Sequence, residues 1–161
     1  MTTGLIELVE RDEQSVAVVR GHVGNSEFDD FLTTAFDEVA QCLAGQRVGA
    51  SGPPFARYRA TGRGLDVEAG FPVDGAVRPS GRVALSQLPG GLRVSAPHVG
   101  HHGTVGFTYE LLQEWLAGNG YAAAGDAWES YSDGYGDAAR TTVVTLPCRR
   151  RTAVPAPRIH V

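Results

Sequence analysis

A duplicated pattern of strands and helices constrains the fold of this chain more than any other feature of its sequence. The triplet His22-Val23-Gly24 recurs as His98-Val99-Gly100, and each copy follows a short apolar strand and precedes an amphipathic helix. The two strands are predicted at residues 15–21 and 91–97. Because the repeated segment is longer than one unit of a solenoid, it indicates two fused halves.

Apolar residues at helical spacing predict one helix in each half. The first helix is expected to begin near Ser26, where Asp29 completes a weak capping box, and to end at Gly45. The second is expected over residues 104–117, with Gly118 or Gly120 ending it.

A Gly-rich turn, an aromatic strand and a closing strand follow each helix. The aromatic strands are predicted at residues 53–59 and 126–132, the closing strands at 65–73 and 140–148, and further strands at 5–10 and 82–88. Aligning Phe55 with Trp128 places Tyr58 on Tyr131. The pattern predicts an α+β fold in which two strand–helix–strand–strand halves form an antiparallel sheet with two helices and a groove between the halves.

This organisation predicts one domain over residues 1–148, composed of pseudo-repeats 1–76 and 77–148. A tail that contains Pro and Arg is expected at residues 149–161. The segment before Ser15 is too short for a helix-turn-helix, so we expect no DNA-binding module in this chain.

Composition argues against several classes of partner. The formal net charge is −4, whereas nucleic-acid binding needs a basic face. All basic residues are Arg, which removes lysine-based Schiff-base and phosphate-loop chemistry. No apolar run reaches membrane-spanning length and no signal peptide is evident, so we expect a cytoplasmic protein with Cys42 and Cys148 as reduced thiols.

Glu129 is the unusual residue of the second aromatic strand. Alternation puts Trp128 and Ser130 on one face, and Glu129 and Tyr131 on the other. Because a large indole suits the contact with a helix, we expect Trp128 to pack there and Glu129 to look out from the opposite face. Two interpretations stay open: Glu129 is a solvated strand residue, or it is the acid of a groove walled by Tyr58 and Tyr131.

The groove interpretation has a definite chemical preference. Aromatic faces attract cations by about 0.5–2 kcal/mol each. A carboxylate about 4 Å from a positive centre adds about 4 kcal/mol at an effective dielectric constant of 20, before desolvation is counted. Flat, apolar cations would therefore gain from both terms, and neutral aromatics only from stacking.

Other candidate residues carry two interpretations each. Tyr109, in the second helix, is either a ligand-binding residue or a core aromatic, and Glu68 is either a second groove acid or an exposed strand acid. His98, His101 and His102 form a histidine cluster without a Cys or carboxylate at ligand spacing, so we expect no metal and no cofactor.

Several stretches together resemble a known family. GPPFARYR, DVEAGFPV, HVGHHGTVGFTYELLQEWL, AAGDAWESY and TTVVTLP are similar to the GyrI-like domain, the effector-binding domain of multidrug-sensing AraC- and MerR-type regulators. The resemblance covers most of the chain and implies the same duplicated fold. It also implies that Glu129 lies in the ligand groove with Tyr131 as its companion. His101-His102 depart from the small residues that the family more often has at the start of this helix.

Two functions follow as hypotheses. The first is a stand-alone multidrug-binding protein that captures hydrophobic, often cationic, aromatic small molecules, with sequestration or signalling to a separate protein partner as its role. The second, implied by hydrolases that the family resemblance includes, is hydrolysis of cyclopropane-bearing DNA-alkylating compounds. In that case Glu129 would activate water, and Tyr58 or Tyr131 would donate a hydrogen bond to the developing phenoxide.

Overall fold

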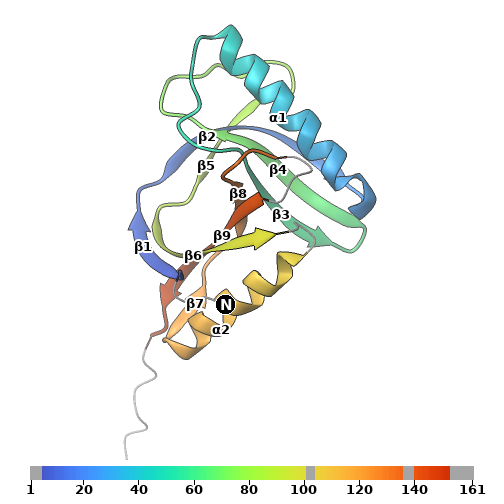
Figure 1. Cartoon of the computed structure of the whole chain (residues 1–161). Coiled ribbons are helices and arrows are strands. Elements are labelled where there is room, and N and C mark those ends of the chain that lie inside the picture. The colour runs from blue at the N-terminus through green and yellow to red at the C-terminus, as the bar shows by residue number, and fades with distance from the viewer. Residues whose placement is uncertain (1–4, 101–103, 136–139, 153–161) are drawn as a thin grey trace, which may run out of the picture.

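The protein is an α+β fold in which two helices pack on a curled antiparallel sheet (Figure 1). The computed structural model describes residues 5–100, 104–135 and 140–152. His101 and His102 lie outside the described residues. Neither helix in the described ranges is long and apolar enough to cross a membrane.

The boundaries agree with the sequence pattern to within a few residues, apart from one additional short strand, β7. The elements follow one another in this order: β1 (Glu7–Arg11), β2 (Gln14–Val23), the 3-10 turn η1 (Asn25–Glu27), α1 (Phe28–Gly45), β3 (Phe55–Thr61), β4 (Gly64–Pro72), β5 (Ala84–Leu88), β6 (Gly91–Gly100), α2 (Gly106–Gly118), β7 (Tyr121–Ala123), β8 (Trp128–Tyr131) and β9 (Arg140–Arg150).

The strand order has the same arrangement read from either end. It runs β1-β6-β9-β8-β3-β4-β2-β5, and β7 adds to β9. Exchanging β1 with β5, β6 with β2, β9 with β4 and β8 with β3 reproduces the order in reverse. The predicted antiparallel α+β fold is confirmed, and the two most central strands, β3 and β8, are the two aromatic ones.

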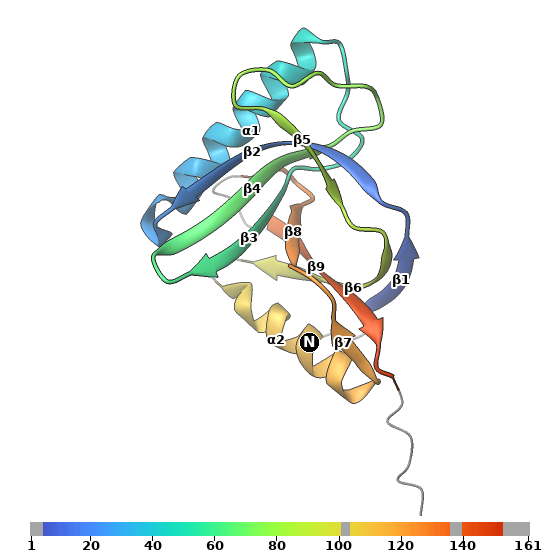
Figure 2. The same cartoon turned by 180° about the vertical axis from the view of Figure 1, so that it is seen from behind.

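The sheet curls at two short links, one between β1 and β2 and the other between β5 and β6, because the strands on the two sides of each link have different partners. β1 pairs with β6, whereas β2 pairs with β5, although only Asp12 and Glu13 separate β1 from β2 (Figure 2). The link between β5 and β6 contains Gly90, where an added Cβ would lie 2.8 Å from the Glu13 backbone nitrogen. The close crossing of the two links therefore depends on a residue without a side chain.

Helix α1 lies along the sheet and buries the stripe that its spacing predicts. Its buried residues are Phe28, Leu32, Ala35, Phe36, Val39 and Leu43. The expected capping box is not formed: η1 precedes the helix, the N-cap is Glu27, and no side chain bonds to the cap. The acidic first turn, with Asp29 and Asp30, favours the helix start through the dipole instead.

Both faces of the sheet are buried, and this corrects the expected place of Trp128. Trp128 packs with Val16, Val18, Phe55 and Leu88, a cluster that contains no helix residue. Tyr131 instead belongs to the core beneath α1. Since the curl gives the sheet a second buried side, a large indole fills that side and the helix contact falls to the other set of alternate residues.

The last strand also differs from expectation. β9 continues through Arg150, so Arg149 and Arg150, expected in the tail, pair with Ala122 and Tyr121 of β7.

The two histidines of the repeated triplet do not occupy equivalent places. His98 faces α2, where its ring nitrogens contact the Thr108 and Thr104 hydroxyls at 3.0 and 2.8 Å. His22 pairs with Asp66, while its neighbour Gly21 faces α1 and leaves room for Phe31. The two triplets therefore lie one residue out of phase.

Candidate functional site

The candidate site is built around a carboxylate buried in the middle of the sheet. Glu129 lies on β8, between β3 and β9, and its exposed fraction is 0%. Its Cα partner across the β3–β8 pair is Ala56, and its partner on β9 is Val144. Ala56 occupies in β3 the place that Glu129 occupies in β8, so only one of the two central strands carries an acid here.

Three phenol groups donate hydrogen bonds to this carboxylate. The Tyr58 and Tyr109 hydroxyls both donate to Oε2 of Glu129, Tyr109 at 2.8 Å. The Tyr131 hydroxyl donates to Oε1 at 3.0 Å. Each carboxylate oxygen is thus held by at least one phenol, and the three phenols come from three different elements.

The strand register explains why two of these phenols meet at Glu129. Tyr58 stands two residues after Ala56 on β3, and Tyr131 stands two residues after Glu129 on β8. Alternate residues share a face, so both rings rise on the side of the sheet that carries Glu129. The antiparallel pairing places one ring on each side of the carboxylate.

The third phenol arrives from the helix. Tyr109 lies one turn before Leu112, which is fully buried against β6 and β9. This packing fixes the helix, and the partly buried Tyr109 then extends toward Glu129.

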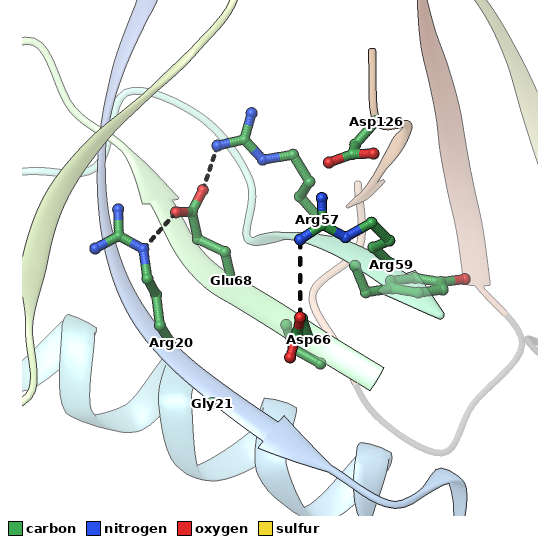
Figure 3. A pocket seen from close by; sticks show the side chains of 9 residues that line it. Arg20, Gly21, Arg57, Arg59, Asp66, Glu68 and Asp126 are labelled. Carbon is green, nitrogen blue, oxygen red and sulfur yellow. Dashed lines mark hydrogen bonds and ion pairs between the residues drawn. The ribbon is translucent and has the colours of Figure 1, made fainter. Parts of the chain in front are cut away.

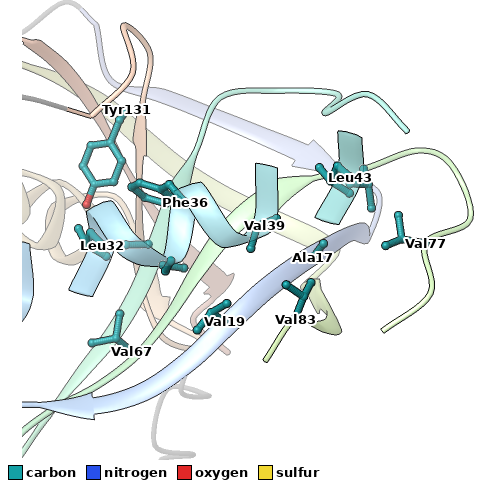
Figure 4. Close-up of a cluster of buried hydrophobic side chains, with 14 of the residues drawn as sticks. Ala17, Val19, Leu32, Phe36, Val39, Leu43, Val67, Val77, Val83 and Tyr131 are labelled. Carbon is teal, nitrogen blue, oxygen red and sulfur yellow. The ribbon is translucent and has the colours of Figure 1, made fainter. Parts of the chain in front are cut away.

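Further aromatic rings support the phenols. Phe28 of α1 meets Tyr58 edge to face, with ring centroids 5.0 Å apart. Phe36 and Tyr135 pack against Tyr131 in the same manner, at 6.0 and 4.8 Å. Figure 4 shows Tyr131 beside Phe36 and Leu32 in the core beneath α1. Such pairs contribute about 0.5–1.5 kcal/mol beyond their buried area, so the phenols are held in defined positions.

Burial and the nearby carboxylate keep the phenols protonated. Burial is the largest cause that raises the pKa of Tyr58, Tyr109 and Tyr131, and the negative charge of Glu129 raises each of them further. The phenols therefore remain hydrogen-bond donors at neutral pH.

The hydrogen bonds make a buried charge tolerable without removing it. A hydrogen bond to a charged group contributes about 1.5–3 kcal/mol, which offsets part of the cost of taking a carboxylate out of water. Neutral phenols spread the negative charge over their hydroxyls but add no positive charge. The arrangement therefore presents aromatic rings around a negative centre, which is the environment that an organic cation prefers.

Four of the five predicted ligand-binding residues come together, and the fifth does not. Glu129, Tyr58, Tyr109 and Tyr131 form one hydrogen-bonded cluster, hereafter the carboxylate–phenol cluster. Glu68 lies on the other face of the sheet, where Arg20 and Arg57 bind its two oxygens (Figure 3). Glu68 is thus separated from the cluster by the sheet itself, as the alternation along its strand indicates.

The structure describes only His98 of the three clustered histidines. His98 contacts two threonine hydroxyls, and no group of three or more His, Cys, Asp or Glu side chains is arranged to hold a metal in the described ranges.

Sequence reasoning missed two residues next to the cluster. Tyr135 packs on Tyr131, and its hydroxyl donates to Asp29 in the first turn of α1. Burial and the Asp29 hydrogen bond raise its pKa. Tyr135 lies in a Gly- and Asp-containing loop without periodicity, so its sequence carries no signal for this contact. Phe28 belongs to the apolar stripe of α1, and helical spacing by itself indicates a core residue there and not a site residue.

Comparison with known proteins gives one family match over most of the chain. The profile of the GyrI-like small molecule binding domain matches residues 6–146. No match was found among curated proteins.

Solved structures with a similar fold include two of EcmrR. A crystal structure of the EcmrR C-terminal domain has a TM-score of 0.75 and 20% identity, covering 90% of this chain and 97% of that one. In a cryo-EM structure of an EcmrR–DNA complex, the TM-score is 0.76 at 20% identity over 91% of this chain, which spans 57% of the EcmrR chain. A hydrolase from Listeria innocua has a TM-score of 0.64 and 13% identity, with 90% and 92% coverage. At these identities the likeness concerns the fold.

Proposed function

Because the chain belongs to the GyrI-like small-molecule-binding domain family, we propose that its carboxylate–phenol cluster captures hydrophobic, often cationic, aromatic compounds. The observation that carries the proposal is Glu129, a fully buried carboxylate that three phenols hold in place. A carboxylate kept only for solubility would face water. One buried among aromatic rings favours a ligand that brings positive charge and flat apolar surface together.

Access to the cluster is supported by the uneven burial of its phenols. Tyr131 is 1% exposed, and its hydroxyl donates a hydrogen bond to Oε1 of Glu129. Tyr58 and Tyr109 are only partly buried, and both donate to Oε2. A ligand would therefore approach the rings of Tyr58 and Tyr109, while Tyr131 keeps the carboxylate in position.

The energetic expectation separates charge from shape. A cation about 4 Å from Glu129 gains about 4 kcal/mol at an effective dielectric constant of 20, before its own desolvation is subtracted. A neutral aromatic of the same shape gains only the ring contacts. Binding selectivity for positive charge should therefore depend on Glu129, and binding of flat molecules in general on the tyrosine rings.

The test compares two ligands and two proteins. Glu129→Gln should weaken binding of a rhodamine cation at least about tenfold, or about 1.4 kcal/mol. It should leave a neutral aromatic of similar shape nearly unaffected. Fluorescence anisotropy gives both affinities. Equal losses for the two ligands, or no loss for either, would remove the role of the charge.

A matched control removes one negative charge at a surface position away from the cluster. Glu114 is an exposed acid on α2, so Glu114→Gln removes the same charge from the surface. Rhodamine affinity should stay within about twofold of the original, because exposed charges are screened by solvent and salt. A similar loss in both variants would mean that overall charge attracts the dye.

A second candidate function uses the same residues on a reactive ligand. A hydrolase shares the fold, and a carboxylate beside phenol donors suits acid–base chemistry. Glu129 would take a proton from water as the water oxygen bonds to a carbon of a strained cyclopropane. The cleaved carbon–carbon bond would leave its electron pair on a conjugated carbonyl, and Tyr58 or Tyr131 would stabilise the resulting phenoxide.

Turnover distinguishes the two functions. The protein would be mixed with an excess of a cyclopropane-bearing alkylating compound, and products would be followed by chromatography. Capture alone predicts that bound compound saturates at the protein concentration without chemical change. Ring-opened product that grows with time beyond the protein concentration, and is lost in Glu129→Gln, would establish hydrolysis instead.

We propose that the protein acts in the cytoplasm, either by sequestering such compounds or by reporting their presence to a separate protein.

A further inference from the structure

A pocket lies on the face of the sheet turned away from Glu129. Its volume is about 650 Å³ and its walls are formed by β2, β3, β4 and Asp126 (Figure 3). This volume is in the range of sites for small organic molecules. Its charged lining residues are three arginines and three acids: Arg20, Arg57, Arg59, Asp66, Glu68 and Asp126.

The charges form two rows across three neighbouring strands. Arg20, Glu68 and Arg57 are direct partners across β2, β4 and β3. His22, Asp66 and Arg59 form the next row in the same way. In both rows the acid lies on the middle strand with a basic residue on each side, and of these basic residues the three arginines line the pocket.

In the first row, both carboxylate oxygens of Glu68 accept hydrogen bonds from guanidinium groups, and further guanidinium N–H donors remain for a ligand. Arg20 Nε donates to Oε2 of Glu68 at 2.9 Å, and Arg57 Nη2 donates to Oε1 at 2.5 Å. Arg57 Nη2 also reaches the Gln87 carbonyl at 3.3 Å. The two terminal amino groups of Arg20 donate to none of the residues that the structure describes. Glu68, 12% exposed, thus holds two guanidinium groups in place while leaving donors for another acceptor.

The second row adds a more exposed cation at the same pocket. Arg59 is 65% exposed, and its Nη2 lies 3.8 Å from Asp66, a longer contact than those of Glu68. Asp66 is closer to His22, at 2.7 Å. Arg59 can therefore turn toward a ligand without breaking a strong ion pair.

We propose that this pocket binds a small oxyanion, the carboxylate or phosphate group of an organic ligand. Planar guanidinium groups match both groups with paired N–H donors, and prior fixation by Glu68 lowers the entropy that binding costs. Asp126 lines the same pocket and opposes an anion there. Its charge gives the proposal a directional test, because neutralising it should strengthen binding.

The pocket and the carboxylate–phenol cluster share Tyr58, which lines the pocket, but their acids lie on opposite faces of the sheet. Glu129 and Tyr58 face the helices, whereas Arg57 and Glu68 face the opposite side of the same strands. The oxyanion proposal therefore does not depend on the function proposed for Glu129.

The experiment is a titration of the 15N-labelled protein followed by NMR at constant ionic strength. Inorganic phosphate is one probe and benzoate the other, so the two sources of an oxyanion are compared directly. Saturable shifts confined to amides of β2, β3 and β4 near the pocket are expected for at least one probe. Shifts that stay linear, or are spread over the whole chain, for both probes would overturn the proposal.

Three variants sharpen the result. Arg59→Gln should weaken binding about fivefold and preserve the fold, because its side chain is mostly exposed. Asp126→Asn should strengthen binding about twofold or more, since it removes a like charge. Arg57→Gln should abolish saturation, with its melting temperature measured because Glu68 loses a partner. Unchanged affinity in both Arg59→Gln and Asp126→Asn would refute the site.

Discussion

Glu129 shows how a residue that is costly to bury can be kept in a core. Its carboxylate has three phenol donors, and the rings that carry them are themselves packed against Phe28, Phe36 and Tyr135. Removal of one donor would leave a buried oxygen with less compensation, which costs about 1–3 kcal/mol. The cluster therefore behaves as a unit, and its donors are as important as its acid.

A pH titration tests the electrostatics of this unit. The pKa values of Tyr58, Tyr109 and Tyr131 are raised above 10, first by burial and then by Glu129. The unfolded chain ionises its tyrosines near pH 10, so the stability that the neutral phenols contribute is complete below that pH. This contribution is lost as pH rises toward the raised pKa values of the folded protein.

Absorbance of the tyrosinate ion measures the effect. The chain has 5 tyrosines, and in the folded protein only a part of them should ionise between about pH 10 and 11, before alkaline unfolding releases the rest. In Glu129→Gln the delayed tyrosines should ionise at lower pH, although burial keeps them above the ordinary value. Ionisation of all tyrosines together near pH 10 in a folded protein would contradict this description.

At the scale of elements, the sequence predicted the strands and the sharing of faces better than the direction of each face. Alternation correctly placed Glu129 with Tyr131, and alignment of the two halves correctly placed Tyr58 on the same side. Trp128 was placed wrongly because a flat two-layer arrangement has one buried face, whereas a curled sheet has two. When both faces of a strand are buried, the alternation of hydrophobic residues does not indicate which face packs against a helix.

Contacts from outside the sheet were the least predictable. Tyr109 was equally suited to a core and to a site, since its helix position alone does not say how far α2 stands from β8. Tyr135 depends on a loop whose path no periodicity indicates.

The tight pairing of β2 with β4 gives a prediction at this scale. A Cβ added at Gly70 would lie 1.8 Å from the carbonyl oxygen of Ala17, so the backbone must move to accept it. Gly70→Ala should therefore destabilise the fold by about 3 kcal/mol, which lowers the melting temperature by roughly 6–12 °C.

The control for this substitution is Gly49→Ala. Gly49 has no atom within 4 Å of the added Cβ, so its replacement should change the melting temperature little. Thermal unfolding followed by circular dichroism measures both variants. Equal melting temperatures for Gly70→Ala and the unsubstituted protein would show that β2 and β4 are not packed as described.

The whole molecule combines a nearly symmetric frame with an asymmetric centre. The strand order is the same from either end, yet the two central strands pair Ala56 with Glu129. Two aromatic strands thus supply matching phenols, and only one supplies the charge. The duplicated frame thus supplies Tyr58 and Tyr131 on the two sides of the acid, and under the proposed function this single acid would give the site its preference for cations.

A crystal structure of the protein with a bound rhodamine dye tests ligand binding at the carboxylate–phenol cluster most directly. The dye is predicted to lie against the rings of Tyr58 or Tyr109, within about 6 Å, with its positive charge directed toward Glu129. A dye found on the opposite face, with the Glu129 carboxylate and its three phenols unchanged and uncontacted, would contradict the account.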